Sequence, residues 1–252
     1  MKTQVIKWFV LIVSMVCSSG HASTLVETIP TVKKSIVAIA IYNPVSAPRL
    51  RLIGTGFVVG QGNVIATNNH VVMKSLDAAV KERYVVLSGS GSEPKVHEIQ
   101  ATSTSPRFDL ALLKINETLP ALPLAQKNYV AEGSALAFTG FPITDVLGLY
   151  PATHVAYLSA VTPIAIPAPT SEAISAQTIR QLRDPFMIYQ LDATAYPGNS
   201  GSPLYDQASG QVVGIINMVF VKSSREAVLS DPSGISYAIP VKHLHDLLTD
   251  LK

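Results

Sequence analysis

The stretch Ala193-Thr194-Ala195-Tyr196-Pro197-Gly198-Asn199-Ser200-Gly201-Ser202-Pro203-Leu204 places a serine in a glycine-flanked tight turn. Strand-like runs lie on both sides of it, at residues 187–191 and 212–219. Because glycine permits backbone conformations that are closed to other residues, such a turn can expose the Ser200 hydroxyl and gather backbone N–H groups around it. Acyl transfer requires that combination of a nucleophile and donors for a developing oxyanion. Short motifs of this kind also occur in ordinary turns, so this one needs support from elsewhere in the chain.

Two upstream segments contain the partners that a serine nucleophile needs. Within residues 64–72, a strand-like run ends in Thr-Asn-Asn and is followed by His70. In residues 108–114 the carboxylate of Asp109 opens an apolar run, where a buried charge is costly unless it is paired. Taken singly, His70 is explained as a structural histidine, and Asp109 is explained as a cap at the end of a strand. With Ser200 they follow the order His, Asp, Ser of the chymotrypsin-like proteases rather than that of α/β-hydrolases or subtilisins.

Five segments, in this order, resemble the trypsin-like domain of the HtrA/Deg serine proteases over roughly residues 30–250. They are Gly-Thr-Gly-Phe-Val-Val (54–59), Thr-Asn-Asn-His-Val-Val (67–72), Asp-Leu-Ala-Leu-Leu-Lys (109–114), Gly-Asn-Ser-Gly-Ser-Pro-Leu (198–204) and Tyr-Ala-Ile-Pro (237–240). The resemblance implies an all-β fold of two six-stranded antiparallel β-barrels of the chymotrypsin/trypsin type with a C-terminal helix. One position departs from it. Ser202 stands where HtrA proteins usually have a second glycine, and there the chain resembles the staphylococcal glutamyl endopeptidases.

The resemblance also implies a role for each residue of the motifs. Ser200 attacks the scissile carbonyl, His70 takes its proton and later delivers one to the leaving amine, and Asp109 fixes the imidazole tautomer. The backbone N–H groups of Gly198 and Ser200 hold the oxyanion. The expected enzyme is a trypsin-like serine endopeptidase that works without a cofactor.

Residues 1–22 have the features of a secretory signal peptide. A positively charged start is followed by an apolar core over residues 8–17, which is too short for a membrane span. Small residues lead to an expected cut after Ala22; an uncleaved anchor and a lipoprotein cut before Cys17 are the alternatives. The mature protein is therefore expected in the periplasm or outside the cell, without membrane contact.

The composition of the mature chain excludes several classes of site. Loss of Lys2 and Lys7 reduces the 19 basic residues to 17, equal to the 17 acidic ones, so nucleic acid is not an expected partner. Cys17 is the single cysteine and leaves with the leader, so no disulfide framework or thiolate metal site is expected. No other cluster has metal-ligand spacing, and no metal is expected. The expected partners are polypeptide substrates, and a homo-oligomer stays open.

The expected domain organisation is a signal peptide followed by two barrels. Residues 23–120 form the N-terminal barrel, which carries His70 and Asp109, and residues 121–252 form the C-terminal barrel with Ser200 and a final helix. The expected strands are 36–42, 52–59, 64–67, 84–87, 96–102 and 111–115 in the first barrel, and 134–140, 153–161, 187–191, 212–219 and 236–239 in the second. The expected helices are 25–34, interrupted by Pro30, and one that begins at Pro240.

Four histidines of the expected mature chain and one long segment remain outside the motifs. His97 and His154 lack motif context, and His243 and His245 fall off the apolar face of the final helix, so both of the latter are read as surface residues. Residues 163–185 form a long loop. It precedes the turn around Ser200 (residues 193–204), which we call the nucleophile turn. A flap near the substrate cleft and a solvent-exposed insertion are equal alternatives for this loop.

The primary specificity pocket is predicted to be uncharged. By the trypsin-like layout, Thr194 lies near its base, and residues 234–238 lack the histidine that glutamyl endopeptidases use. Aliphatic residues before the cut and unfolded substrates are therefore expected. Asn199 is neutral and cannot form the salt bridge of trypsinogen-style activation. The predicted pocket residues are Thr194, Ile215, Asn217 and Ser236.

The expected function is cleavage of unfolded chains in quality control of exported proteins, by a protease domain without a PDZ domain on the same chain. A catalytically silent homologue that binds polypeptides is the first alternative. A secreted, residue-specific protease of the glutamyl endopeptidase type is the second, and it depends on Ser202 alone.

Overall fold

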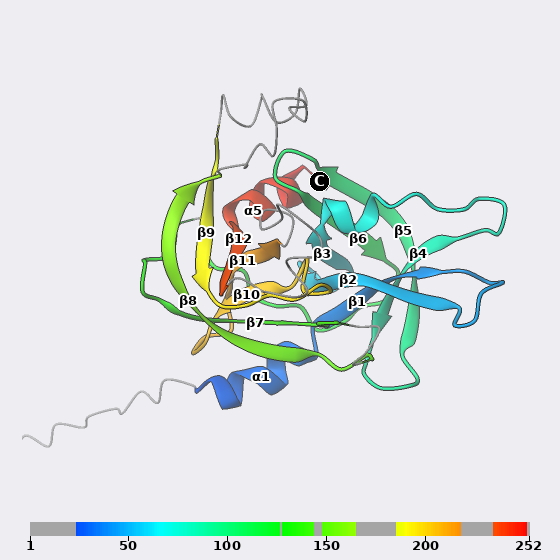
Figure 1. Cartoon of the computed structure of the whole chain (residues 1–252), viewed down its shortest axis with the longest axis horizontal. Coiled ribbons are helices and arrows are strands. Elements are labelled where there is room, and N and C mark those ends of the chain that lie inside the picture. The colour runs from blue at the N-terminus through cyan, green and yellow to red at the C-terminus, as the bar shows by residue number, and fades with distance from the viewer. Residues whose placement is uncertain (1–23, 127, 144–147, 165–184, 218–233, 251–252) are drawn as a thin grey trace, which may run out of the picture.

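Two closed six-stranded antiparallel β-barrels stand side by side in the computed structural model, which describes residues 24–126, 128–143, 148–164, 185–217 and 234–250 (Figure 1). This confirms the predicted fold class. The predicted signal peptide and nearly all of the long 163–185 segment lie outside the described residues. No helix in the described ranges is long and apolar enough to cross a membrane.

The N-terminal barrel is built from the first half of the chain in the order β1-β2-β3-β6-β5-β4. Its strands are β1 (Ile36–Tyr42), β2 (Leu50–Val59), β3 (Val64–Asn68), β4 (Arg83–Ser88), β5 (Lys95–Ser105) and β6 (Leu110–Ile115). The run Ile-Val-Ala-Ile-Ala-Ile-Tyr of β1 is apolar throughout because both of its faces are covered. Val37 and Ile39 face the barrel interior, whereas Ala38 and Ala40 pack into the layer between the two barrels.

The C-terminal barrel follows the order β10-β11-β12-β9-β8-β7. Its strands are β7 (Ala135–Gly140), β8 (Ala152–Pro163), β9 (Met187–Asp192), β10 (Pro203–Asp206), β11 (Val212–Asn217) and β12 (Ile235–Pro240). The strand β10 was not predicted, because it has four residues, begins with proline and directly follows the nucleophile turn. Its pairing with β7 and β11 closes the barrel.

Two α-helices and a short 3₁₀ helix complete the described structure. Helix α1 (Leu25–Lys33) matches the predicted lead-in helix, and Thr24 and Glu27 form a capping box at its start. The 3₁₀ helix η1 (Asn69–Val72) follows β3, and α5 (Lys242–Thr249) closes the chain. The prediction that His243 lies on the surface was wrong: only 5% of this residue is exposed, because the β5–β6 turn of the other barrel covers that side of α5.

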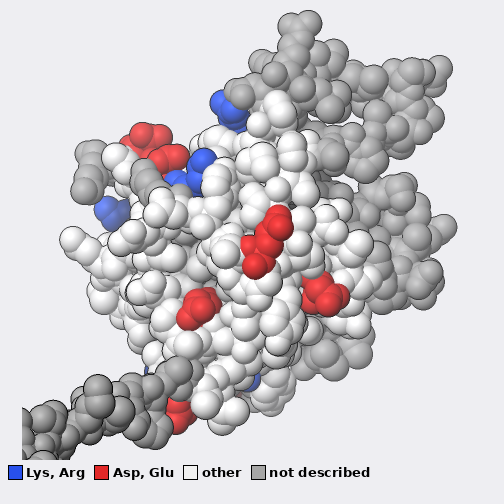
Figure 2. All heavy atoms as spheres, turned by 90° about the vertical axis from the view of Figure 1, so that its left-hand side faces the viewer, with Lys and Arg blue, Asp and Glu red and all other residues white. Residues whose placement is uncertain are grey.

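Charge is thinly spread over the outer face of the C-terminal barrel. Figure 2 shows acidic side chains that stand apart from one another on a largely uncharged surface. Val155 and Tyr157 of β8 leave about half of their surface exposed, at 53% and 51%. The charges drawn on this face do not gather into the basic stripe that is typical of nucleic-acid-binding surfaces.

Candidate active site

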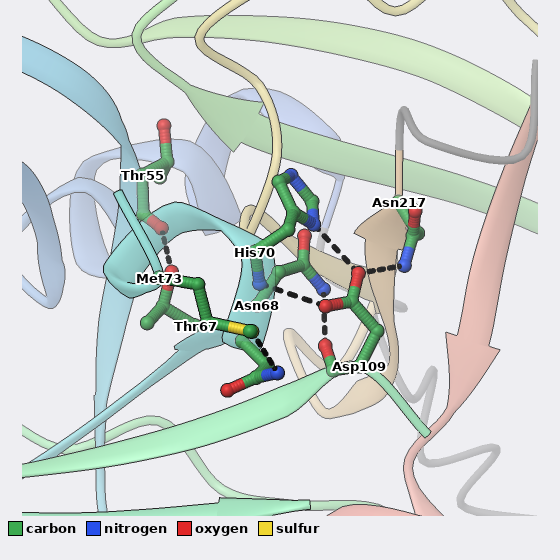
Figure 3. Close-up of polar contacts among 8 residues, drawn as sticks. Thr55, Thr67, Asn68, His70, Met73, Asp109 and Asn217 are labelled. Atoms are coloured by element: carbon green, nitrogen blue, oxygen red, sulfur yellow. Dashed lines mark hydrogen bonds and ion pairs between the residues drawn. The ribbon is translucent and has the colours of Figure 1, made fainter. Parts of the chain in front are cut away.

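The pairing of β3 with β6 brings His70 and Asp109 together. Asn68 lies opposite Leu110 at the end of this ladder, so the residues that follow and precede the two strands are neighbours. His70 Nδ1 lies 2.6 Å from Asp109 Oδ2, and the backbone N–H of His70 donates to Asp109 Oδ1 at 2.8 Å (Figure 3). Both carboxylate oxygens therefore fix the position of the His70 residue, one through its ring and one through its backbone.

Backbone contacts fix the conformation of Asp109 itself. Its carbonyl oxygen accepts hydrogen bonds from the backbone N–H of Asn69 and from the side-chain amide of Asn68, each at 3.1 Å. Its φ of 51° is in the left-handed region, which aspartate enters more readily than most residues but which still needs support from its surroundings. The segment Thr-Asn-Asn before His70 supplies part of that support.

A third donor reaches the Asp109 carboxylate from the other barrel. The side-chain amide of Asn217, at the end of β11, donates to Asp109 Oδ2 at 2.7 Å and so shares this oxygen with His70 (Figure 3). This contact was not predicted, because nothing in the local sequence connects Asn217 with a residue 108 positions earlier. The amide holds the carboxylate at the junction of the two barrels.

The nucleophile turn packs against the segment that carries His70. The backbone N–H of Thr55 donates to the Ser200 carbonyl at 2.9 Å. A Cβ added at Gly54 would lie 2.8 Å from the Val71 side chain and 3.3 Å from the Ser200 carbonyl oxygen, so this glycine allows the two segments to approach closely. Ser200 is 7% exposed. The hydrogen bonds among the described residues do not include one between its hydroxyl and the imidazole of His70.

The turn presents two backbone donors. Gly198 has a φ of 100°, and a Cβ there would collide with the carbonyl oxygen of Phe141, so only glycine fits. The N–H of Ile143 donates to the Pro197 carbonyl at 2.7 Å, and in a trans peptide this directs the Gly198 N–H to the opposite side. Within the described part of the chain, neither the Gly198 nor the Ser200 N–H donates a hydrogen bond. Both remain available to an incoming acceptor.

Thr55 on β2 connects the N-terminal barrel to this turn. Its hydroxyl donates to the Gly198 carbonyl at 2.7 Å and accepts from the Phe141 backbone N–H at 3.0 Å. Its own carbonyl accepts from the hydroxyl of Thr67 at 2.7 Å. Thr55 is fully buried, so each of these groups depends on protein partners. The Gly-Thr-Gly segment singled out in the sequence thus positions the turn rather than touching the side chains of His70 and Asp109.

The predicted pocket residues lie in three different settings. The hydroxyl of Ser236 accepts from the Ala195 backbone N–H at 2.8 Å and donates to the Ala193 carbonyl at 2.7 Å, which ties both sides of Thr194 to β12. The side chain of Ile215 belongs to the buried core that both barrels share, and that of Asn217 contacts Asp109. That these four residues select the substrate remains a prediction.

Two further histidines lie outside the motifs. His97 is fully buried between the Ser88 hydroxyl, 2.7 Å from Nε2, and the Glu117 carboxylate, 3.1 Å from Nδ1. It lies at the end of β5 remote from Asp109. His154 is half-buried, stacks on Phe138 and has its ring centroid 6.3 Å from that of Tyr196, and burial lowers the pKa of its imidazole. Among the described residues, no group of three His, Cys, Asp or Glu side chains is placed to hold a metal ion.

Known proteins resemble this chain in both sequence and fold. The model of the trypsin-like peptidase domain matches residues 54–215, more than half of the chain. A probable periplasmic serine endoprotease, DegP-like, from Pseudomonas fluorescens is 30% identical over 201 residues, which are 79% of this chain and 35% of that protein. The DegP-like protein of Halomonas elongata is 28% identical over 203 residues, 80% of this chain and 35% of its own. The chain thus spans about a third of the length of these curated relatives.

Solved protease structures share the architecture. The active form of the Rv3671c protease from M. tuberculosis superposes with a TM-score of 0.62 at 21% identity, covering 88% of this chain and 82% of that one. The HtrA-type protease AlgW with a tripeptide gives a TM-score of 0.64 at 22% identity, over 90% of this chain and 63% of that one. At these identities the structures support the fold, and together with the sequence matches they confirm the resemblance to HtrA/Deg proteases.

Proposed function

The chain belongs to the trypsin-like peptidase domain family, and from that premise we propose that it is a serine endopeptidase whose triad is His70, Asp109 and Ser200. The observation that carries the proposal is the 2.6 Å pair of His70 Nδ1 and Asp109 Oδ2, together with a turn whose two backbone donors are unpaired among the described residues. Removal of one oxyanion donor from a serine protease raises the activation free energy by about 2.7–4 kcal/mol. The two N–H groups are therefore expected to account for a large part of the rate acceleration.

The reaction proceeds through an acyl-enzyme. Ser200 Oγ bonds to the carbonyl carbon of the substrate while its proton passes to His70 Nε2, and the oxyanion is held by the N–H groups of Gly198 and Ser200. The C–N bond then breaks, and the leaving amine takes the proton from His70. Water repeats the sequence on the ester and restores the serine. Asp109 keeps the Nδ1 proton in place and stabilises the imidazolium, and Asn217 orients this carboxylate.

The proposed substrates are unfolded polypeptides with uncharged aliphatic residues such as Val, Ala or Leu before the cut. The feature that supports this is the uncharged stretch around Thr194. Cleavage is expected to be permissive, because a missing or extra methylene in an apolar pocket changes the discrimination between substrates by only about 1–3 kcal/mol. Export to the periplasm, by analogy with the names of the DegP-like relatives, fits a role in quality control. Digestion of one protein in folded and denatured form, with the cut sites mapped, tests this. Cuts mainly after Lys, Arg or Glu, or equal digestion of the folded form, would reject it.

A fluorophosphonate probe tests the triad directly. Wild type and the Ser202→Ala variant are expected to be labelled on Ser200, whereas Ser200→Ala is expected to lose both labelling and peptide cleavage, by a factor on the order of 10⁶ in kcat. Ser202 is the matched control because it lies in the same turn and is fully buried. A wild-type protein that binds unfolded chains but takes no label would instead be the catalytically silent homologue. Labelling that survives in Ser200→Ala and is lost in Ser202→Ala would move the nucleophile.

A further inference from the structure

A three-ring aromatic cluster joins the final helix to the turn that carries Asp109. The imidazole of His243 on α5 stacks on Phe108, with ring centroids 3.9 Å apart and an angle of 21° between the planes. Phe186 stands edge-on to both rings, with its centroid 5.0 Å from that of Phe108 and 5.4 Å from that of His243. The stack therefore connects the C-terminal barrel with the β5–β6 turn of the N-terminal one.

The His243 ring acts in this cluster as a flat aromatic surface. Both of its nitrogens are buried and have no hydrogen-bond partner among the residues that the structure describes. Burial lowers the pKa of this imidazole to about 4, so the ring is neutral at ordinary pH. Burying polar nitrogens without partners is unfavourable, and the contact that the ring makes in return is the stack on Phe108.

Phe108 lies directly before Asp109, at the point where the backbone is most constrained. Asp109 has its left-handed φ of 51°, and its N–H makes a long 3.4 Å bond to the Pro106 carbonyl. Such a conformation persists where the surroundings over-determine it. The polar side of the residue is held by Asn68 and Asn69, and the preceding side chain is held by the His243 stack. The carboxylate is also held by the His70 N–H and the Asn217 amide, so loss of the stack would release the support on the side of the preceding residue.

We propose that His243 is a positioning residue for the reaction, which holds Asp109 in line with His70 through Phe108. The inference rests on the proposed triad, in which the carboxylate must stay fixed on Nδ1 of the imidazole. It assigns the C-terminal helix a part in the geometry of a site on the opposite barrel. The stacked ring, and not its nitrogens, carries the effect, so a phenylalanine is expected to replace it.

The test compares His243→Ala, His243→Leu and His243→Phe with His245→Ala in the full chain. His245 is the control because it is on the same helix and hydrogen-bonds to the Ala125 carbonyl at 2.8 Å, away from Asp109. The Leu variant fills the space without a flat ring and guards against a fold failure in the Ala variant. We expect the Ala and Leu variants to lower kcat about 10- to 100-fold with KM changed less than about threefold, since small misplacements of catalytic groups cost this much. The Phe variant and His245→Ala should stay within about threefold of wild type.

A second readout separates positioning from stability. The low-field proton resonance of the His70–Asp109 hydrogen bond is expected to shift or broaden in the Ala and Leu variants and to keep its position in His243→Phe and His245→Ala. A wild type without cleavage or probe labelling would count against the proposed function itself. An active wild type with an unchanged resonance and unchanged kcat in the Ala and Leu variants would overturn the inference alone. A kcat loss in His243→Phe equal to that in His243→Ala would also overturn it.

Discussion

Thr55→Val removes one hydroxyl from the centre of the structure while it keeps the shape of the side chain. The lost groups are a donor to the Gly198 carbonyl at 2.7 Å and an acceptor for the Phe141 N–H at 3.0 Å. Phe141 is buried and Gly198 is half-buried. An unsatisfied buried group costs about 1–3 kcal/mol, so the loss is expected to be about 1–3 kcal/mol of unfolding free energy for the Phe141 N–H and at most as much again for the Gly198 carbonyl. Thr55→Ser keeps the hydroxyl and loses a methyl group, which is expected to cost about 1 kcal/mol.

The same change reaches catalysis through Gly198. The hydroxyl of Thr55 orients the peptide that follows Gly198, and the N–H of Gly198 is one of the two proposed oxyanion donors. A donor that leaves its position costs about 2.7–4 kcal/mol in the transition state, or roughly 10²–10³ in kcat. We therefore expect Thr55→Val to lose about 100-fold in kcat and Thr55→Ser to lose less than about fivefold.

Urea unfolding and steady-state cleavage of an unstructured peptide measure the two effects on the same preparations. The slope of free energy against urea must stay constant for the comparison to hold. If Thr55→Val unfolds within about 1 kcal/mol of wild type and cleaves at the same rate, the hydroxyl does not hold the turn. Equal losses in the Val and Ser variants would attribute the effect to the methyl group instead.

Two further predictions concern Asn217 and His243. Asn217→Ala removes a donor to the Asp109 carboxylate and should lower kcat/KM about tenfold. Asn217→Asp should lower kcat/KM further, because it places a second carboxylate against Asp109. Variants with wild-type kcat/KM would contradict this. The folded-state pKa of His243, about 4 against an ordinary 6.5, means that the unfolded chain binds the extra proton, so stability falls as pH drops from about 6.5 to 4, by on the order of 3 kcal/mol. Arg107 and Lys242 oppose protonation and Asp246 favours it. Urea unfolding at pH 7 and pH 4 should show a smaller loss of unfolding free energy in His243→Phe than in wild type. Equal losses in the two proteins would show that His243 is not the group responsible.

Local patterns in the sequence were sufficient for the individual strands and helices, and the resemblance to HtrA/Deg proteases supplied their arrangement in two barrels. Runs of β-branched residues predicted eleven of the strands within a few positions, and the apolar spacing after Pro240 predicted α5. Strand formation follows from residue type and from the alternation of side chains, both of which are local. The strand β10 was missed because a four-residue segment after a turn is too short to show a period. The order of the motifs likewise predicted which side chains, His70 and Asp109, would meet.

The sequence by itself therefore determined the individual strands and the turn around Ser200, which follow from short-range pattern. Its resemblance to HtrA/Deg proteases supplied the two barrels and the pairing of His70 with Asp109. Tertiary structure alone decided the supports of the site. Thr55 meets Gly198 across 143 positions, and Asn217 meets Asp109 across 108. His243 is buried although helical periodicity places it off the apolar face. The physical reason is common to all three: each contact depends on how the second barrel and its helix pack on the first, and a pattern within one segment carries no information about the surface that will cover it.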